Sequence, residues 1–258
     1  DKNREPLVRL LDHGVRVRYF DHHFAGDIPS HPLLDAHIGT LADEGTSLLV
    51  DAFVGGRFRA WAVVGTFGDN FDQAARRAAA PLDLSADDLT DLRELGVCLN
   101  YNGYGERVED LHFPPDVLFR RLTPYTDPLD FVRHDEAYAT LRAGFADDMA
   151  RAAEATAELA TDRHAVYILP AEPWARRVSG VLANDLAQGV PDRAHALLTR
   201  LPEGGFVVSV RAPLIAADGA DALCRQFPTG GGRKAAAGIN RLPEAEYDAF
   251  VQRFLSAF

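Results

Sequence analysis

The sequence predicts a two-domain α/β protein, in which a parallel-sheet domain is joined by a long helix to a smaller mixed α/β domain. Three observations predict this architecture. Strand-like and helical runs alternate before residue 128, a stretch rich in strong helix formers follows, and the alternation restarts after residue 161. We therefore place the first domain at 1–128, the connecting helix at 129–161 and the second domain at 162–258.

Composition limits the class of protein. The chain has 258 residues, of which 47% are apolar and 25% charged, as in globular proteins with ordinary cores. The net charge of −11 argues against non-specific binding of duplex nucleic acid through a broad basic face. No apolar run approaches the roughly 20 residues of a membrane span, and no signal peptide is evident. Cys98 and Cys224 lie in apolar contexts without metal spacing, so we expect reduced core residues in a cytoplasmic protein.

The first elements are a helix, a strand and a polar turn. A helix is expected at 6–13, with Pro6 in its first turn and Gly14 at its end. The alternating residues 15–20 predict a strand, which delivers Asp21-His22-His23 to its C-terminal end. Because a parallel sheet is buried on both faces by flanking elements, we expect strands of the same sheet to precede Asp1.

The rest of the first domain alternates between short elements. A strand is expected at 33–38, and helices are expected at 46–53, 72–80, 85–95 and 114–122. Residues 59–66 are mostly apolar and fit either a helix or a strand, and Asp69 follows them. Residues 99–105 form a polar, glycine-rich turn, which is either a plain loop or a place where Asn100 and Asn102 face a phosphate or base.

The connecting helix and the second domain follow. Residues 132–161 contain no proline and one glycine, and they predict about 45 Å of helix at 1.5 Å per residue. Strands are expected at 164–169, 194–201 and 206–213, and helices at 174–188, 220–227 and 243–258. Residues 202–205 predict a hairpin turn.

Two segments carry residues suited to phosphate chemistry. Two imidazoles and a carboxylate at one strand end are a ligand set for divalent metals, and ligands bind at this edge of open α/β sheets. For an isolated His22-His23 pair, a solvated turn would be the simpler interpretation. In the second domain, Gly230, Gly231 and Gly232 precede Arg233. Consecutive glycines let backbone N–H groups approach an anion, so we favour a tight anion-facing turn here over a flexible loop. Arg176, Arg177 and Arg211 of the same domain could add positive charge, although we favour surface salt bridges for them.

Three motifs, Asp21-His22-His23, residues 65–69 and residues 230–238, resemble the DHH phosphoesterase superfamily with its C-terminal DHH-associated domain in order and spacing. RecJ-type exonucleases, oligoribonucleases and cyclic dinucleotide phosphodiesterases belong to this group. The resemblance implies a two-metal site, usually Mn²⁺ with Mg²⁺ or Co²⁺ as alternatives, and a cleft between the two domains.

The resemblance also implies roles for single residues. Asp1, His22 and Asp69 would be metal ligands, and Asp21 would brace the imidazoles from behind. His23 and Arg233 would be the catalytic groups that contact phosphate. The implied substrate-binding residues are Asn100, Asn102, Gly230, Gly231, Gly232 and Arg233.

Two features depart from the family pattern. The early His/Asp/Asp motif is absent from these residues, which removes about half of the ligands of a two-metal site. Arg233 stands where the family usually has His. Its guanidinium suits bidentate phosphate contact but cannot act as an acid or base near neutral pH, so we expect charge stabilisation there.

The sequence therefore predicts a metal-dependent phosphodiesterase or exonuclease-like hydrolase of short oligonucleotides or phosphorylated nucleotides. The acidic net charge favours short, single-stranded substrates, with no duplex preference and no membrane association, and a homodimer is compatible with the sequence. The alternative is a non-catalytic nucleotide-binding or regulatory protein of the same fold. The incomplete ligand set and Arg233 favour this alternative.

Overall fold

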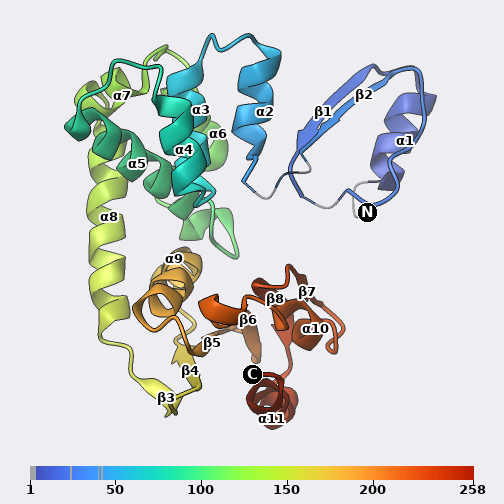
Figure 1. The fold of residues 1–258 in the computed structure, drawn as a ribbon, viewed down its shortest axis with the longest axis vertical. Helices are drawn as coiled ribbons and strands as arrows, with labels where there is room; N and C mark the ends of the chain where they lie inside the picture. Colours follow the sequence, from blue (N-terminus) through green and yellow to red (C-terminus); the bar gives the residue numbers. More distant parts are fainter. Residues whose placement is uncertain (1–3, 24, 40, 42) are drawn as a thin grey trace. The chain divides into compact units, whose positions relative to one another are not determined.

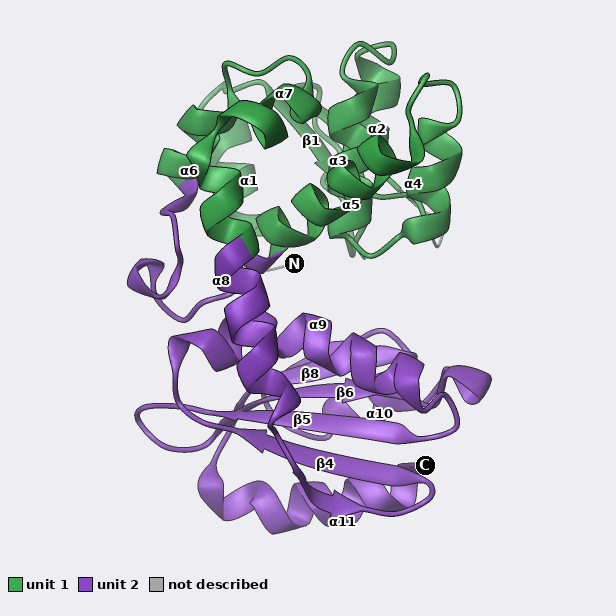
Figure 2. Cartoon of the chain, turned by 90° about the vertical axis from the view of Figure 1, so that its left-hand side faces the viewer, with its two compact units in different colours: residues 1–100, 116–142 green, residues 101–115, 143–258 purple. Residues whose placement is uncertain are grey.

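The computed structural model describes residues 4–23, 25–39, 41 and 43–258 (Figure 1). The chain divides into two compact units, unit 1 at Asp1–Asn100 with Asp116–Arg142 and unit 2 at Tyr101–Pro115 with Ala143–Phe258 (Figure 2). Unit 1 contains a pair of parallel strands followed by helices, and unit 2 contains a mixed six-stranded sheet with helices. The predicted α/β class is therefore confirmed, while the division at 1–128, 129–161 and 162–258 stays a prediction.

Unit 1 begins with a helix and a pair of parallel strands. Helix α1 spans Arg4–Asp12 and is followed by Gly14 at φ 77°, a conformation that favours glycine. Strands β1 (Val17–Asp21) and β2 (Leu34–Ile38) pair in parallel, as the alternation in this region predicts. The strands contact the next helix through aromatic rings, because Phe20 stacks on His37 at 4.6 Å and meets Phe53 edge-on at 5.3 Å.

The rest of unit 1 is helical. Its helices are α2 (Thr46–Phe53), α3 (Arg59–Gly68), α4 (Asp72–Ala79), α5 (Ala86–Tyr101), α6 (Pro115–Leu122) and α7 (Pro128–His134). The undecided residues 59–66 are thus helical. Glycines allow α3 to pack closely, because a Cβ on Gly96 of α5 would lie 2.3 Å from the Val64 carbonyl oxygen. A Cβ on Gly65 would likewise lie 2.8 Å from Cβ of Ser47 in α2.

Helix α5 starts where the sequence indicates but ends later. The Ser85 hydroxyl accepts the backbone N–H of Asp88 at 3.1 Å, and the Asp88 carboxylate accepts the backbone N–H of Ser85 at 3.2 Å, which is a reciprocal cap. The helix continues to Tyr101 rather than stopping near residue 95. The predicted loop at 99–105 is therefore wrong for Asn100, which is helical.

The helix expected at 132–161 is not continuous in the structure. Asp135 has extended backbone (φ −102°, ψ 124°) after α7, and its carboxylate accepts the N–H of Ala137 at 2.9 Å, which caps α8 (Glu136–Ala153). Residues Ala157–Ala160 form strand β3, which pairs antiparallel with β4 (His164–Leu169). Strand pairing here overrides the helix-favouring composition.

Unit 2 is built on a sheet of order β3-β4-β5-β6-β8-β7. The further strands are β5 (Ala194–Arg200), β6 (Phe206–Arg211), β7 (Gly230–Gly232) and β8 (Ala236–Leu242). Only β4 and β5 pair in parallel among the described strands of this sheet. The predicted β5–β6 hairpin is confirmed, and Gly204 and Gly205 turn it at φ 89° and 84°.

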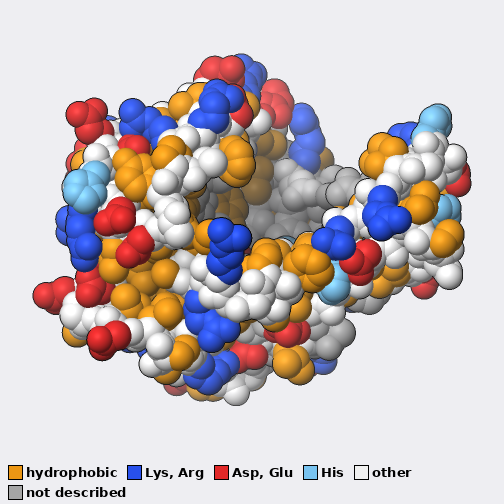
Figure 3. Space-filling view, turned by 90° about the horizontal axis from the view of Figure 1, so that it is seen from above, with side chains coloured by type: hydrophobic (Ala, Val, Ile, Leu, Met, Phe, Trp, Pro, Cys, Tyr) orange, Lys and Arg blue, Asp and Glu red, His pale blue; other side chains and the backbone are white. Residues whose placement is uncertain are grey.

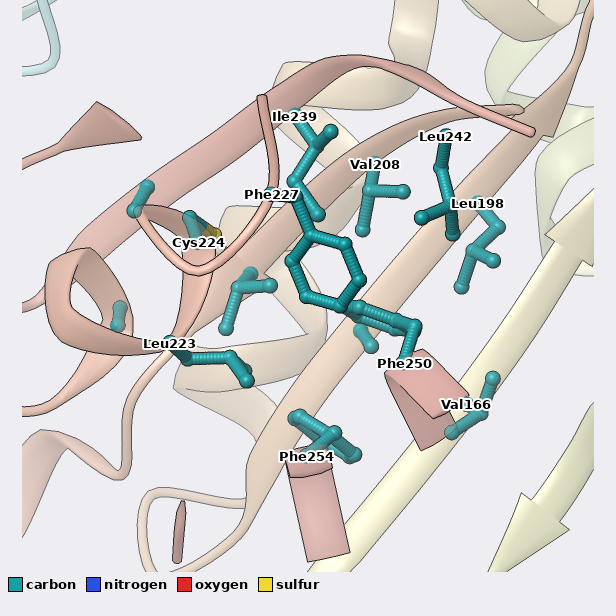
Figure 4. Close-up of a cluster of buried hydrophobic side chains, with 14 of the residues drawn as sticks. Val166, Leu198, Val208, Leu223, Cys224, Phe227, Ile239, Leu242, Phe250 and Phe254 are labelled. Atoms are coloured by element: carbon teal, nitrogen blue, oxygen red, sulfur yellow. The ribbon is translucent and has the colours of Figure 1, made fainter. Parts of the chain in front are cut away.

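Helices cover the two faces of this sheet (Figure 2). Helix α9 (Pro173–Gly189) packs on one face, where Val178 and Leu182 contact Leu197. Helices α10 (Ala220–Cys224) and α11 (Tyr247–Ala257) pack on the other face, where Phe250 and Phe254 gather with Val208 (Figure 4). The 3₁₀ helices of the chain are η1 (Val108–Asp110), η2 (Leu214–Ala216) and η3 (Glu244–Glu246). The predicted closing helix at 243–258 is thus η3 followed by α11.

The cysteines are structural. Cys98 and Cys224 are both buried and unpaired, and burial raises the pKa of each thiol to about 12. The prediction of reduced core cysteines is confirmed. Among the described helices, none has the length and apolarity that a membrane crossing requires.

Candidate functional site

Strand β1 carries its last residue, Asp21, directly into His22 and His23. One ligand atom from each of these three residues lies within 4.8 Å of the other two. The two imidazole rings lie side by side, with centroids 4.3 Å apart and planes tilted by 30°. The structure thus brings the predicted Asp-His-His residues together at one strand end.

Both oxygens of the Asp21 carboxylate have hydrogen-bond partners. Its Oδ1 accepts the backbone N–H groups of His22 at 2.8 Å and His23 at 3.0 Å and lies 2.8 Å from Nδ1 of His23. Its Oδ2 accepts the Tyr19 hydroxyl at 2.9 Å. Burial acts to raise the pKa of Asp21, but these hydrogen bonds outweigh it and lower the pKa to about 2. The carboxylate is therefore ionised and positioned to orient His23, as expected of a brace rather than a metal ligand.

His22 is held by the first residue of α2. Its Nδ1 lies 2.8 Å from the Thr46 hydroxyl, and the Phe71 ring packs edge-on at 5.7 Å between centroids. The backbone N–H of Thr46 also donates to Nδ1 at 3.2 Å. A metal at Nε2 requires the other tautomer, in which Nδ1 donates to the Thr46 hydroxyl and Nε2 carries the lone pair. The local contacts of His22 therefore fit a metal ligand.

Asp69 ends helix α3 beside the start of α2. A Cβ on Gly45, the N-cap residue of α2, would lie 3.1 Å from Oδ2 of Asp69. Gly45 directly precedes Thr46, so Asp69 and His22 flank the same turn. Asp69 and Asn100 also line one cavity of about 190 Å³.

These donors fit a divalent metal. Imidazole together with carboxylate is a ligand pair for Mn²⁺, Co²⁺ or Zn²⁺. His22 and Asp69 would hold the ion, and His23 adds a second imidazole, which contacts Asp21 through Nδ1 and leaves Nε2 on its other side. Asp1, the third predicted ligand, lies outside the described residues.

The glycine triplet is a strand rather than the predicted turn. A Cβ on Gly230 would lie 1.7 Å from the Cys224 carbonyl oxygen, and one on Gly232 would lie 2.5 Å from Cα of Ala237. Both glycines are thus needed so that β7 can pack against α10 and β8. A Cβ on Gly231 would meet no described atom within 4 Å, so this glycine faces open space.

The strand register places small and polar residues side by side on the α9 face of the sheet. Ser209 of β6 pairs with Gly238 of β8, which pairs with Gly231 of β7. Arg211 lies two residues along β6 and therefore on the same face. The backbone at Gly231 and Gly238 thus forms an open surface beside a hydroxyl and a guanidinium.

Arg211, for which the sequence favours a surface salt bridge over added charge at a site, is a candidate anion-binding residue. Its Nε donates to Oδ1 of Asn184 and its Nη1 to Oγ of Ser209, both at 2.8 Å, and it forms no ion pair with a carboxylate in the described part of the chain. Burial lowers the pKa of Arg211, and the neighbouring Arg233 lowers it further. A partly desolvated guanidinium beside a second cation suits an anion.

Arg176 and Arg177, considered in the sequence as surface ion pairs, make buried ones. Arg176 pairs with Glu106 and Arg177 with Asp148, each at 2.7 Å, and both arginine side chains are 12% exposed. They join α9 to α8 and to the 101–115 segment within unit 2. We therefore assign them to the fold.

Asn102 is not available to a substrate. It is 2% exposed, its amide donates to the Phe113 carbonyl at 2.8 Å, and its carbonyl accepts the Phe113 N–H at 3.1 Å. The predicted substrate contact of Asn102 is therefore wrong, because its polar atoms close a loop. Asn100 remains a candidate through the cavity that it shares with Asp69.

Comparison with known proteins identifies the fold. The structure of RecJ from Thermus thermophilus in complex with Mn²⁺ is 21% identical with a TM-score of 0.55, and the match covers 97% of this chain and 42% of RecJ. The pGpG-specific phosphodiesterase PggH from Vibrio cholerae is 11% identical with a TM-score of 0.48, covering 90% of this chain and 82% of PggH. An exopolyphosphatase-related protein from Bacteroides fragilis is 16% identical with a TM-score of 0.43, covering 93% of this chain and 64% of that protein.

The RecJ comparison shows which fold this chain has. The chain has the fold of the Thermus RecJ structure, so the predicted resemblance to RecJ-type proteins is confirmed at the level of the fold. Models of protein families and curated proteins provided no match. The chain spans 42% of the length of the Thermus RecJ.

Proposed function

We propose that the protein is a metal-dependent phosphodiesterase acting on short oligonucleotides or phosphorylated nucleotides. The observation that carries this proposal is the Asp21-His22-His23 cluster, whose ligand atoms lie within 4.8 Å of one another. Asp21 and Thr46 contact the Nδ1 atoms of its two imidazoles, which would leave both Nε2 atoms for a ligand. His22 and Asp69, with Asp1 as a further ligand, would hold Mn²⁺, with Mg²⁺ or Co²⁺ as alternatives.

The chain's own residues have distinct tasks in this proposal. Bound metal would supply Lewis-acid stabilisation and activate a water molecule. The His23 side chain is 76% exposed and held by Asp21, so its Nε2 is placed to hydrogen-bond a phosphate oxygen. Arg233 and Arg211 would bind phosphate by charge-assisted hydrogen bonds, without transferring a proton. Gly231, which faces open space, would let that phosphate approach the backbone of β7 and β8.

Charge supports a small or single-stranded substrate. The net charge is −11, and acidic and basic side chains are interspersed on the face that Figure 3 shows, with no continuous basic area among the described residues there. A duplex would require neutralisation of many phosphates along one surface. A homodimer and a cytoplasmic location stay predictions from the sequence.

Hydrolysis of an aryl phosphodiester tests the proposal. We expect Mn²⁺-dependent turnover of bis(p-nitrophenyl) phosphate, abolished by EDTA and reduced about 100-fold or more by His22→Ala, because even residues behind a metal ligand typically contribute 10–100-fold. His13→Ala, an exposed histidine at the end of α1, is the matched control and should retain wild-type turnover. Equal turnover by His22→Ala and the wild type would contradict the metal site.

The second candidate is a non-catalytic nucleotide-binding protein. The pairing of Arg211 with neutral partners favours it, because this anion-binding face needs no metal. Nucleotide binding in the presence of Mn²⁺ without any turnover would support this second candidate.

A further inference from the structure

We propose that unit 2 contains a pocket for the nucleobase of a 5′-phosphorylated nucleotide, beside the face that carries Arg211 and Gly231. The proposal rests on the proposed function in that the phosphate is bound on this face. It adds that the protein recognises a nucleotide by its base, which a site for phosphate alone would not do.

The pocket is a cavity of about 210 Å³. Its lining residues come from α9, three neighbouring strands and the segment after α5, and they include Tyr104, Arg176, Ser179, Thr199, Val207 and Asn240. All of these residues belong to unit 2.

The strand register connects the pocket to the anion-binding face. Thr199 of β5 pairs with Val207 of β6, and these two residues form part of the pocket wall. Ser209 follows two residues later on the same face, and Arg211 two residues after that. At about 3.4 Å per residue, the Ser209 row lies about 7 Å from the pocket and the Arg211 row about 14 Å. A ligand with its phosphate between Arg211 and Gly231 can therefore extend over the glycine surface into the pocket.

Tyr104 provides an aromatic surface in the wall of the pocket. A Cβ on Gly180 of α9 would lie 3.9 Å from Cζ of Tyr104, so the phenol ring lies close to the helix at a position without a side chain. Tyr104 also interacts electrostatically with Arg211, which places it near the anion-binding face. The residue is 44% exposed, which leaves ring surface for a stacked base.

The polar lining of the pocket suits a base rather than a second phosphate. The charge of Arg176 is neutralised by Glu106 at 2.7 Å. The Asn240 side chain is exposed and makes no hydrogen bond within the described part of the chain, so its amide offers both a donor and an acceptor. The Ser179 hydroxyl donates to the Arg176 carbonyl at 2.9 Å and keeps its lone pairs as acceptors. Paired donors and acceptors of this kind recognise base edges.

Calorimetric titration with AMP, GMP, CMP, UMP and ribose 5-phosphate tests the pocket. We expect at least one nucleotide to bind about 5- to 150-fold more tightly than ribose 5-phosphate, the range expected for one aromatic–base stack. Tyr104→Ala should remove most of this advantage, and Asn240→Leu should reduce the differences among the four bases. Both variants should bind ribose 5-phosphate as the wild type does. Gln226→Leu, a substitution at an exposed position just after α10, is the matched control.

The outcomes separate the two proposals. Ribose 5-phosphate binding without any gain from a base would overturn the pocket and leave the phosphate site intact. Base preference that both variants retain would also overturn it. Absence of Mn²⁺-dependent turnover together with base-selective binding would overturn the hydrolase and not the pocket, whereas absence of all binding would overturn the pocket and the anion-binding face together.

Discussion

Alanine substitutions in the glycine triplet distinguish Gly230, which the fold needs, from Gly231, which is open to a ligand. In Gly230→Ala the new methyl group would lie 1.7 Å from the Cys224 carbonyl oxygen, against an ordinary contact of 3.4–4 Å. Both sides of the contact are backbone, so β7 and α10 must move apart. Overpacking of this kind costs about 1–3 kcal/mol, and the shift weakens the Gly230 N–H bond to Phe227 O (2.9 Å), which adds about 1 kcal/mol.

The neighbouring substitution Gly231→Ala is the matched comparison. Its Cβ would meet no described atom within 4 Å, so we expect a change in unfolding free energy within about 0.5 kcal/mol. Its methyl group would nevertheless cover backbone beside Gly238. Losing one hydrogen bond to a charged phosphate should weaken ribose 5-phosphate binding about 10-fold or more.

Thermal melts and calorimetry check both variants. At about 2–4 °C per kcal/mol, we expect Gly230→Ala to melt about 4–16 °C below the wild type and Gly231→Ala within about 2 °C of it. A Gly230→Ala protein that melts with the wild type would show that β7 does not contact α10 as described. Unchanged ribose 5-phosphate binding by Gly231→Ala would refute the role of the open glycine.

Three further predictions concern stability. Asp148→Ala leaves the buried Arg177 without its carboxylate partner and should lower the free energy of unfolding by about 3–5 kcal/mol, as measured by urea unfolding. A smaller effect would show that the ion pair is exposed. Burial lowers the pKa of His112 and His195, so the unfolded chain binds more protons than the folded chain does. The free energy of unfolding should therefore have its highest value above about pH 6.5 and decline as the pH falls below that value. Melts at about pH 7.5 and 5.5, on either side of the unfolded-state pKa, test this, and His195→Gln should reduce the difference. Saturating Mn²⁺ should raise the melting temperature of the wild type but not of His22→Ala, and equal shifts would place the ion elsewhere.

Local patterns in the sequence were sufficient for several elements of the site. The alternation before Asp21 predicted β1, because a half-buried strand repeats every two residues. The Ser85–Asp88 spacing predicted the start of α5 because a cap involves residues three apart. The clustering of Asp21, His22 and His23 followed from their adjacency in the chain.

Contacts between distant segments decided what local pattern could not. Residues 59–66 fit helix and strand alike, and the close approach of Val64 to Gly96, a residue of a different helix, accommodates the helix. Residues 157–160 have helix-forming composition but pair with β4, because backbone pairing outweighs weak intrinsic propensity.

The sequence alone determined which residue types can bind metal and phosphate, and it determined the elements that carry most of them. Only the tertiary structure decided which are free to do so. Asn102 is occupied by Phe113, whereas Arg211 has neutral partners and lies beside Arg233. The physical reason is that a side chain's availability depends on its neighbours in space, and strand register and helix packing bring those neighbours from remote parts of the chain.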